Sequence, residues 1–227
     1  MRFLFVRHGQ PRWFGDDGVG FANPELTDKG HVQAQAAAAA LADVQVDQLW
    51  VSPTTRSRQT AAPIAEALGM DGQVTPWLEE VRIPTREGMH EDALRAHFEA
   101  ARLMPVDQWW AGLPGCEPYS DFVTRVGGGL EGALQAHFGA EREDTGDVRL
   151  WRDLPSQTIV CVCHAGTTAV AVSHLAGLGQ VPWAWLRLPV AHASISELVS
   201  LRMSTARCFM LARLNDESHM GPELRSR

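Results

Sequence analysis

The chain has 227 residues, of which 45% are hydrophobic and 21% are charged, and its formal net charge is −7 at pH 7. These values are typical of a globular domain and exclude both a disordered chain and a miniprotein held together by disulfides. An acidic chain is also a poor general binder of nucleic acid or of anionic membranes, because both partners require a basic face.

The hydrophobic pattern predicts strands that alternate with helices. In chain order, we expect a strand at 2–7, a helix at 28–42, a strand at 48–52, a helix at 56–68, a strand at 73–75, helices at 90–102 and 119–138, a strand at 158–163, a helix at 167–176 and strands at 193–201 and 207–213. This alternation predicts one α/β domain over residues 1–227, with three α/β/α layers around a mostly parallel central sheet.

Two segments lie outside this regular pattern. Residues 83–118 are rich in proline and contain a Trp109-Trp110 pair, so we interpret them as an irregular lid around one helix. The two tryptophans could line the site beneath such a lid, or they could simply pack within it. The charged residues from about 215 to 227 predict a loose tail.

The sequence also predicts the environment of the protein. It contains no apolar run of about 20 residues, so we expect no membrane span. The apolar run at 2–7 is too short for a signal peptide, so we expect a cytoplasmic protein. None of the four cysteines has C-x-x-C spacing, and Cys161 and Cys163 alternate with valines as reduced core residues would. We therefore expect no metal at these cysteines, while a monomer and a homodimer both remain open.

Two predicted strands end in a histidine that is followed closely by glycine, in Arg7-His8-Gly9 and in His164-Ala165-Gly166. Ligands of open α/β sheets bind at the carboxyl ends of the strands, so these groups are expected at one crevice. Arg56 and Arg58 stand near a helix start, which favours an anion. Residues two apart on a helix point in different directions, so only one of these arginines can face the crevice. Arginines around a nucleophilic histidine suit phosphoryl chemistry.

Six motifs follow one another between residues 7 and 198. They are Arg7-His8-Gly9, Leu26-Thr27-x-x-Gly30-x-x-Gln33-Ala34, Ser52-Pro53-x-x-Arg56-x-x-Gln59-Thr60-Ala61, Leu78-Glu79-Glu80, His164-Ala165-Gly166 and Ala193-Ser194-Ile195-Ser196-Glu197-Leu198. In this order they resemble the motifs of the histidine phosphatases, the phosphoglycerate mutase-like superfamily. The resemblance implies that family's fold and an enzyme that needs no metal or cofactor.

The resemblance also implies a role for individual residues. His8 would be the nucleophile that takes the phosphoryl group, and Arg7, Gly9, Arg56 and His164 would hold that group. Glu80 would protonate the leaving oxygen and later accept a proton from water. The family pattern has one residue between leucine and the acidic residue, which favours Glu80 over its neighbour Glu79.

The motifs predict a metal-independent phosphatase that acts on a small phosphorylated metabolite. One alternative is a phosphoglycerate mutase, although Pro11 and Phe14 stand where mutases typically have a hydroxyl and an amide side chain. A second alternative is a phosphate-binding module without catalytic activity. The lid departs from the family pattern at 81–84 and at 115–118, so the natural substrate stays open.

Overall fold

The computed structural model describes residues 1–83, 87–146, 148–182 and 186–227. The strands are β1 (Arg2–Arg7), β2 (Gln48–Val51), β3 (Gln73–Val74), β4 (Glu141–Thr145), β5 (Val148–Arg152), β6 (Thr158–Cys163), β7 (Ile195–Met203) and β8 (Ala206–Asp216). The α-helices are α1 (Asp28–Leu41), α2 (Thr55–Leu68), α3 (Glu91–Arg102), α4 (Tyr119–Phe138) and α5 (Ala165–Ala176). The described residues also form the short 3₁₀ helices η1 (Pro76–Leu78), η3 (Val106–Ala111) and η5 (Pro222–Leu224). None of the helices within the described ranges is long and apolar enough to cross a membrane.

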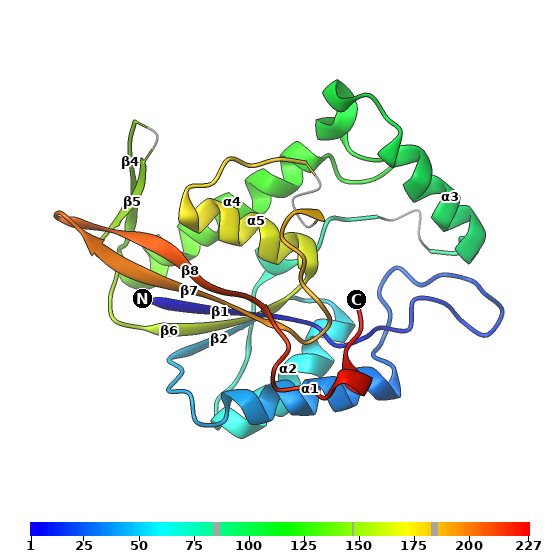
Figure 1. Ribbon diagram of the computed structural model, residues 1–227, viewed down its shortest axis with the longest axis horizontal. Helices are drawn as coiled ribbons and strands as arrows, with labels where there is room; N and C mark the ends of the chain where they lie inside the picture. The colour runs from blue at the N-terminus through cyan, green and yellow to red at the C-terminus, as the bar shows by residue number, and fades with distance from the viewer. Residues whose placement is uncertain (84–86, 147, 183–185) are drawn as a thin grey trace.

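The strands form one mixed sheet in the order β3-β2-β6-β1-β7-β8-β5-β4 (Figure 1). The four strands from β3 to β1 are parallel to one another, as the alternation of strands and helices predicts. From β1 onward every pairing is antiparallel, so the expected mostly parallel sheet describes only half of the observed one. The β4–β5 hairpin was not predicted, because β4 consists of Glu-Arg-Glu-Asp-Thr, which has low β-propensity.

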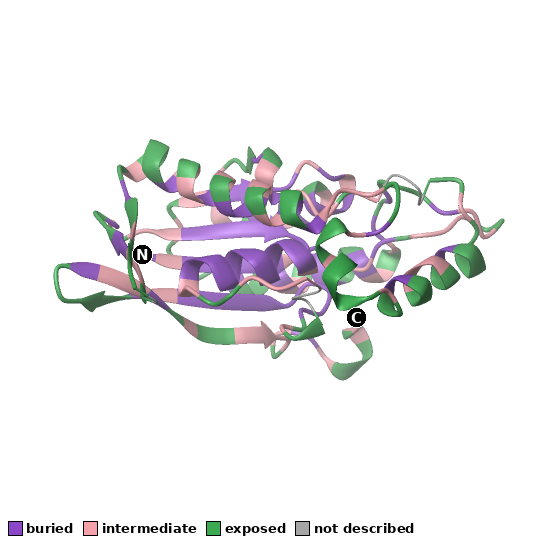
Figure 2. Ribbon diagram, turned by 90° about the horizontal axis from the view of Figure 1, so that it is seen from above, coloured by how far each residue is buried: buried purple, intermediate pink, exposed green. Residues whose placement is uncertain are grey.

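Alternate side chains of the parallel strands build two separate cores. Phe3 and Phe5 of β1 pack in the core beneath α4 and α5, together with Cys161 and Cys163 of β6. The intervening side chains of the same strands pack against α1 and α2 on the other face. Helices therefore lie on both faces of this half of the sheet (Figures 1 and 2). The expected three-layer arrangement is confirmed, and both cysteines are free and buried as predicted.

In the described part of the expected lid, α3 and η3 project beyond the end of the sheet (Figures 1 and 2). Residues 84–86 of the lid lie outside the described residues. The Trp109 indole donates to the carbonyl oxygen of Met104 over 2.9 Å, and Trp110 packs edge to face against Tyr119. Both tryptophans thus pack against lid residues or the start of α4, which agrees with the packing interpretation.

The segment after β8 differs from the predicted loose tail. Met220 is only 2% exposed and packs into the core that faces α1 and α2. The Gln33 side chain of α1 donates to the carbonyl oxygen of Leu224 over 2.5 Å and to the hydroxyl of Ser226 over 2.9 Å. Residues 217–227 therefore lie against α1, because one buried apolar side chain and several hydrogen bonds anchor a stretch whose composition alone suggests disorder (Figure 1).

Candidate active site

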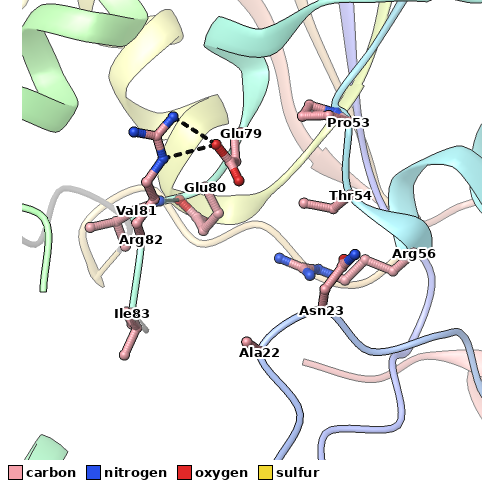
Figure 3. A pocket seen from close by; sticks show the side chains of 10 residues that line it. All are labelled: Ala22, Asn23, Pro53, Thr54, Arg56, Glu79, Glu80, Val81, Arg82 and Ile83. Atoms are coloured by element: carbon pink, nitrogen blue, oxygen red, sulfur yellow. Dashed lines mark hydrogen bonds and ion pairs between the residues drawn. The ribbon is translucent and has the colours of Figure 1, made fainter. Parts of the chain in front are cut away.

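A cavity of about 340 Å³ lies at the carboxyl ends of the parallel strands. Its wall includes Arg56 of α2 on one side and the segment from Glu79 to Ile83 on the other (Figure 3). Ala22 and Asn23, from the loop before α1, complete the rim. The cavity thus stands where the strand-end rule predicts a ligand, and charged side chains face it from two directions.

His8 follows β1 directly and is only 2% exposed. Its Nδ1 lies 2.7 Å from the carbonyl oxygen of Gly9, which can only accept a hydrogen bond. Nδ1 therefore carries the proton, and the lone pair is on Nε2, which accepts from Arg56 Nε over 3.2 Å. Burial, reinforced by the charge of Arg56, holds the pKa of His8 well below its usual value. His8 is therefore neutral, in the tautomer that a nucleophilic imidazole requires.

His164 follows β6 at the start of α5, and its ring centroid lies 5.0 Å from that of His8. Its Nδ1 is 3.2 Å from Arg56 Nη2, which can only donate, so Nε2 carries the proton and donates to Ser52 Oγ over 2.8 Å. Burial and then Arg56 hold the pKa of His164 well below its usual value. Arg56 thus joins the two histidines, as the two strand-end motifs predict.

The two arginines of the α2 motif take different positions. Arg56 is 4% exposed and its guanidinium lies over the ring of Trp13, 5.0 Å from the ring centroid. Arg58 is exposed to solvent. This separation confirms the expectation that only one of the two faces the crevice.

Arg7 is the last residue of β1, and both terminal nitrogens of its guanidinium have hydrogen-bond partners. Nη1 donates to the carbonyl oxygen of Val190 over 2.6 Å, and Nη2 lies 3.0 Å from Nε2 of His192. Nε is buried and has no hydrogen-bond partner among the described residues. Burial lowers the pKa of Arg7 to about 10, so the side chain keeps its charge at neutral pH.

Gly9 holds the loop that carries His8. Its N–H donates to the hydroxyl of Thr60 over 3.0 Å, and its carbonyl accepts from His8. A Cβ at this position would collide with the carbonyl oxygen of Gly30 in α1, so only glycine allows this close approach. Both backbone groups of Gly9 are therefore engaged within the protein, which differs from the expected contact with a substrate.

Glu79 and Glu80 lie side by side but have different partners (Figure 3). The Glu80 carboxylate accepts from the backbone N–H of Val81 over 3.0 Å and from that of Gly166 over 2.8 Å. Glu79 instead forms an ion pair with Arg82 at 2.9 Å. Glu80 is thus connected to the second histidine motif, which agrees with the choice of Glu80 over Glu79.

Arg125 of α4 fixes the segment that carries these two acids. It donates to the carbonyl oxygens of Glu79 and Glu80 over 3.0 and 3.1 Å. It also forms a bidentate pair with Glu117, with both distances 2.8 Å. Although burial alone would raise it, the hydrogen bonds and charge of Arg125 hold the pKa of Glu117 below its usual value. The sequence analysis did not identify the contacts of Arg125 with the carbonyl oxygens of Glu79 and Glu80, because 46 and 45 positions separate these residues in the chain.

His192 is a further site residue that the sequence analysis did not identify. It precedes β7, is 3% exposed and lies with its ring centroid 5.8 Å from that of His8. The late-strand motif begins one residue later, at Ala193, so a polar residue directly before that motif is the only local signal. Its contact with Arg7 depends on how β7 pairs with β1, which no local pattern reveals.

Three buried neutral histidines predict a pH-dependent stability. Burial keeps the pKa values of His8 and His164 well below 6.5 and lowers that of His192 to about 3. Below pH ~6.5 the unfolded chain binds protons at these positions and the folded chain does not. The free energy of unfolding therefore decreases as the pH is lowered. Each histidine contributes up to ~1.4 kcal/mol per pH unit, and the effect is absent above pH ~7.

Urea unfolding at pH 7.5, 6.5 and 5.5 measures this dependence. His192→Gln removes one of the three groups, so its unfolding free energy should change less steeply than that of the wild type. The interpretation would be wrong if the wild-type value did not decline between pH 6.5 and 5.5.

The fold and the site together define an enzyme that acts on phosphate esters. The model of the histidine phosphatase superfamily, branch 1, matches residues 3–216. The chain belongs to this superfamily, which confirms the resemblance seen in the six motifs.

Individual relatives include both mutases and phosphatases. An Escherichia coli protein to which a phosphoglycerate mutase function is ascribed is 28% identical over 201 residues, covering 87% of this chain and 84% of the relative. A Hydrogenobacter thermophilus protein with an ascribed phosphoserine phosphatase function is 28% identical over 181 residues, covering 78% of this chain and 80% of the relative. The mycobacterial glucosyl-3-phosphoglycerate phosphatase solved with VO3 has a TM-score of 0.69 and 25% identity, covering 94% of this chain and 98% of that chain.

Proposed function

We propose that the chain is a metal-independent phosphatase that hydrolyses small phosphomonoesters through a phosphohistidine intermediate on His8. The observation that carries the proposal is the tautomer of His8. The Gly9 carbonyl holds the proton on Nδ1, so the lone pair of Nε2 points toward Arg56 on the cavity wall. A neutral nucleophile beside buried cations is what attack on a phosphate ester requires.

In the first step, Nε2 of His8 attacks the phosphorus atom and the bond from phosphorus to the leaving oxygen breaks. Arg7 and Arg56 donate to the phosphoryl oxygens and offset the charge that develops on them, while His164 holds the Arg56 guanidinium in place by accepting from its Nη2. Glu80, protonated at this stage, gives its proton to the leaving oxygen. The leaving group departs as an alcohol, and the phosphoryl group stays on His8.

In the second step, a water molecule attacks the phosphorus atom of phosphohistidine. Glu80 is now a carboxylate and accepts the proton of that water. The bond between phosphorus and Nε2 breaks, and its electrons restore the lone pair of His8. Inorganic phosphate leaves, and Glu80 is protonated again for the next cycle.

The experiment that tests this proposal is phosphate release from a panel of phosphomonoesters in the presence of EDTA. The panel contains sugar phosphates, nucleotides, O-phosphoserine and 3-phosphoglycerate. We expect release without added metal, and rapid quenching with a ³²P-labelled substrate should trap an acid-labile phosphoenzyme. Release that requires a divalent metal, or turnover without any phosphoenzyme, would contradict the mechanism.

The same panel separates the phosphatase from the mutase. Pro11 and Phe14 form isolated bridges to Leu26 and Gly20, and neither is among the residues that line the cavity. Positions 11 and 14 thus lack the hydroxyl and amide side chains that are typical of mutases there, which supports the phosphatase. Conversion of 3-phosphoglycerate to 2-phosphoglycerate faster than phosphate release would favour the mutase instead.

Replacing Glu80 by glutamine is expected to lower kcat by ~10²- to 10⁴-fold for an alkyl phosphate, because the leaving alkoxide then receives no proton. The loss should be much smaller for p-nitrophenyl phosphate, whose phenolate leaves without protonation. Glu79→Gln removes the neighbouring carboxylate, and any effect it has should be similar for both substrates. A leaving-group dependence in Glu79→Gln rather than in Glu80→Gln would transfer the acid role to Glu79.

A further inference from the structure

Residues 217–227 return to the back of the proposed phosphate site. The backbone N–H of His192 donates to the carbonyl oxygen of Ser226 over 3.0 Å. The Ser226 hydroxyl lies 3.0 Å from Nδ1 of the same histidine and 2.9 Å from Nε2 of Gln33. Two side chains from distant parts of the chain thus meet at one hydroxyl.

The direction of each hydrogen bond follows from Arg7. A guanidinium only donates, so Nε2 of His192 must accept from Nη2 of Arg7 over 3.0 Å. The ring proton is then on Nδ1, which donates to the Ser226 hydroxyl. Burial, with the charge of Arg7, lowers the pKa of His192 to about 3, so this neutral form persists at neutral pH. Ser226 therefore accepts the ring proton of His192 in the only neutral tautomer that can accept from Arg7.

The same hydroxyl is linked to the loop that follows His8. Gln33 donates through Nε2 to Ser226, and its Oε1 accepts from the backbone N–H of Gln10 over 2.7 Å. Gln33 is fully buried, so these contacts are shielded from water. The segment around Ser226 therefore contacts both the partner of Arg7 and the loop of His8.

Arg7 is consequently fixed at two of its three nitrogens. Val190 holds Nη1 and His192 holds Nη2, while Nε is buried and has no partner in the part of the chain that the structure describes. A guanidinium held in this way binds an oxyanion without first losing side-chain freedom. If His192 did not accept from Nη2, Arg7 would keep its charge but lose this orientation.

We propose that His192 is a positioning residue for Arg7 and that Ser226 stabilises the tautomer of His192 that Arg7 requires, so that the segment 222–226 is part of the site that binds the phosphoryl group. The proposal rests on the proposed function to the extent that Arg7 binds that group. According to this proposal, residues outside the six motifs contribute measurably to the affinity of the protein for an oxyanion such as phosphate.

Two substitutions of His192 separate this role from a merely structural one. His192→Gln places an amide oxygen near the position of Nε2 and keeps the acceptor for Arg7, but loses the contact with Ser226. His192→Asn places its amide near the position of Nδ1 and keeps the contact with Ser226, but loses the acceptor for Arg7. The two variants have similar polarity, so they should have similar melting temperatures.

The readout is the affinity for inorganic phosphate, measured by calorimetry, with the melting temperature measured in parallel. We expect His192→Asn to weaken phosphate binding ~10-fold or more and His192→Gln to change it by less than ~3-fold, because only the former removes a charge-assisted hydrogen bond to Arg7. Ser226→Ala should weaken binding to an intermediate extent. Ser218→Ala, in the same segment but exposed, should leave binding unchanged.

Equal phosphate affinities for the two His192 variants, or a loss that follows the melting temperature, would overturn the proposal. Absence of phosphate binding by the wild type would overturn both this proposal and the proposed function. If the wild type binds phosphate but hydrolyses no ester of the panel, the proposed function is wrong, whereas the role of His192 in positioning Arg7 is not contradicted.

Discussion

Replacing His8 by alanine is expected to lower kcat/KM by at least ~10⁴-fold, because no other group can supply the nucleophile. The lone pair of His8 Nε2 accepts from Arg56 Nε, and Nδ1 is committed to the Gly9 carbonyl. His164 cannot replace it, since its Nε2 carries a proton donated to Ser52 and its Nδ1 accepts from Arg56. The measurement is phosphate release together with trapping of the ³²P-labelled phosphoenzyme.

The anion site should survive this substitution. Arg7, Arg56 and His164 keep their own contacts with Val190, Trp13 and Ser52, so His8→Ala should still bind phosphate while it forms no phosphoenzyme. His8→Asn is a second variant, whose amide can still donate to the Gly9 carbonyl. His31→Ala, at an exposed position of α1, is the matched control with unchanged turnover. Activity of His8→Ala above one hundredth of the wild type in a clean preparation would exclude the phosphohistidine mechanism.

The sequence predicts the centre of the site because that centre depends on local rules. His8 and His164 follow buried parallel strands, and the ends of such strands meet at one edge of the sheet. The helix expected at 28–42 does begin at Asp28, and Thr27 caps it because its hydroxyl accepts from the N–H of Gly30. Arg56 and Arg58 separate because they are two residues apart in the first turns of a helix. Each of these expectations needs only the residues nearby.

Local rules do not predict the outer parts of the site, because these parts depend on contacts between residues that are far apart in the chain. The relation between His192 and Arg7 depends on the antiparallel pairing of β7 with β1. Ser226 lies in a charged stretch whose composition suggests disorder, and its order comes from Gln33 and from the burial of Met220. The β4–β5 hairpin, likewise, is charged and escapes a pattern based on hydrophobicity. Composition reports the average tendency of a segment, whereas these contacts depend on specific distant partners.

The contact between Arg125 and Glu117 gives the largest expected loss of stability. Arg125→Met is expected to lower the free energy of unfolding by ~3–5 kcal/mol, because it leaves the Glu117 carboxylate buried without its ion pair. Glu117 has a side chain only 9% exposed, so water cannot replace the arginine. Urea unfolding at pH 7.5 measures the change. Arg95→Met breaks an ion pair between exposed side chains with Glu91, and should cost less than ~0.5 kcal/mol.

Loss of Arg125 should also lower turnover, and a double variant separates this effect from stability. The carbonyl oxygens of Glu79 and Glu80 lose the Arg125 donor and only Glu79 keeps another, from Thr167, so the backbone that carries the Glu80 carboxylate is held less firmly. A displacement of about 1 Å at an acid–base group can reduce kcat by ~10²-fold. Adding Glu117→Gln removes the unpaired charge, so the double variant should recover much of the stability while kcat stays low. Recovery of both quantities would mean that Arg125 acts on turnover only through folding, whereas recovery of stability alone would show that it positions Glu80.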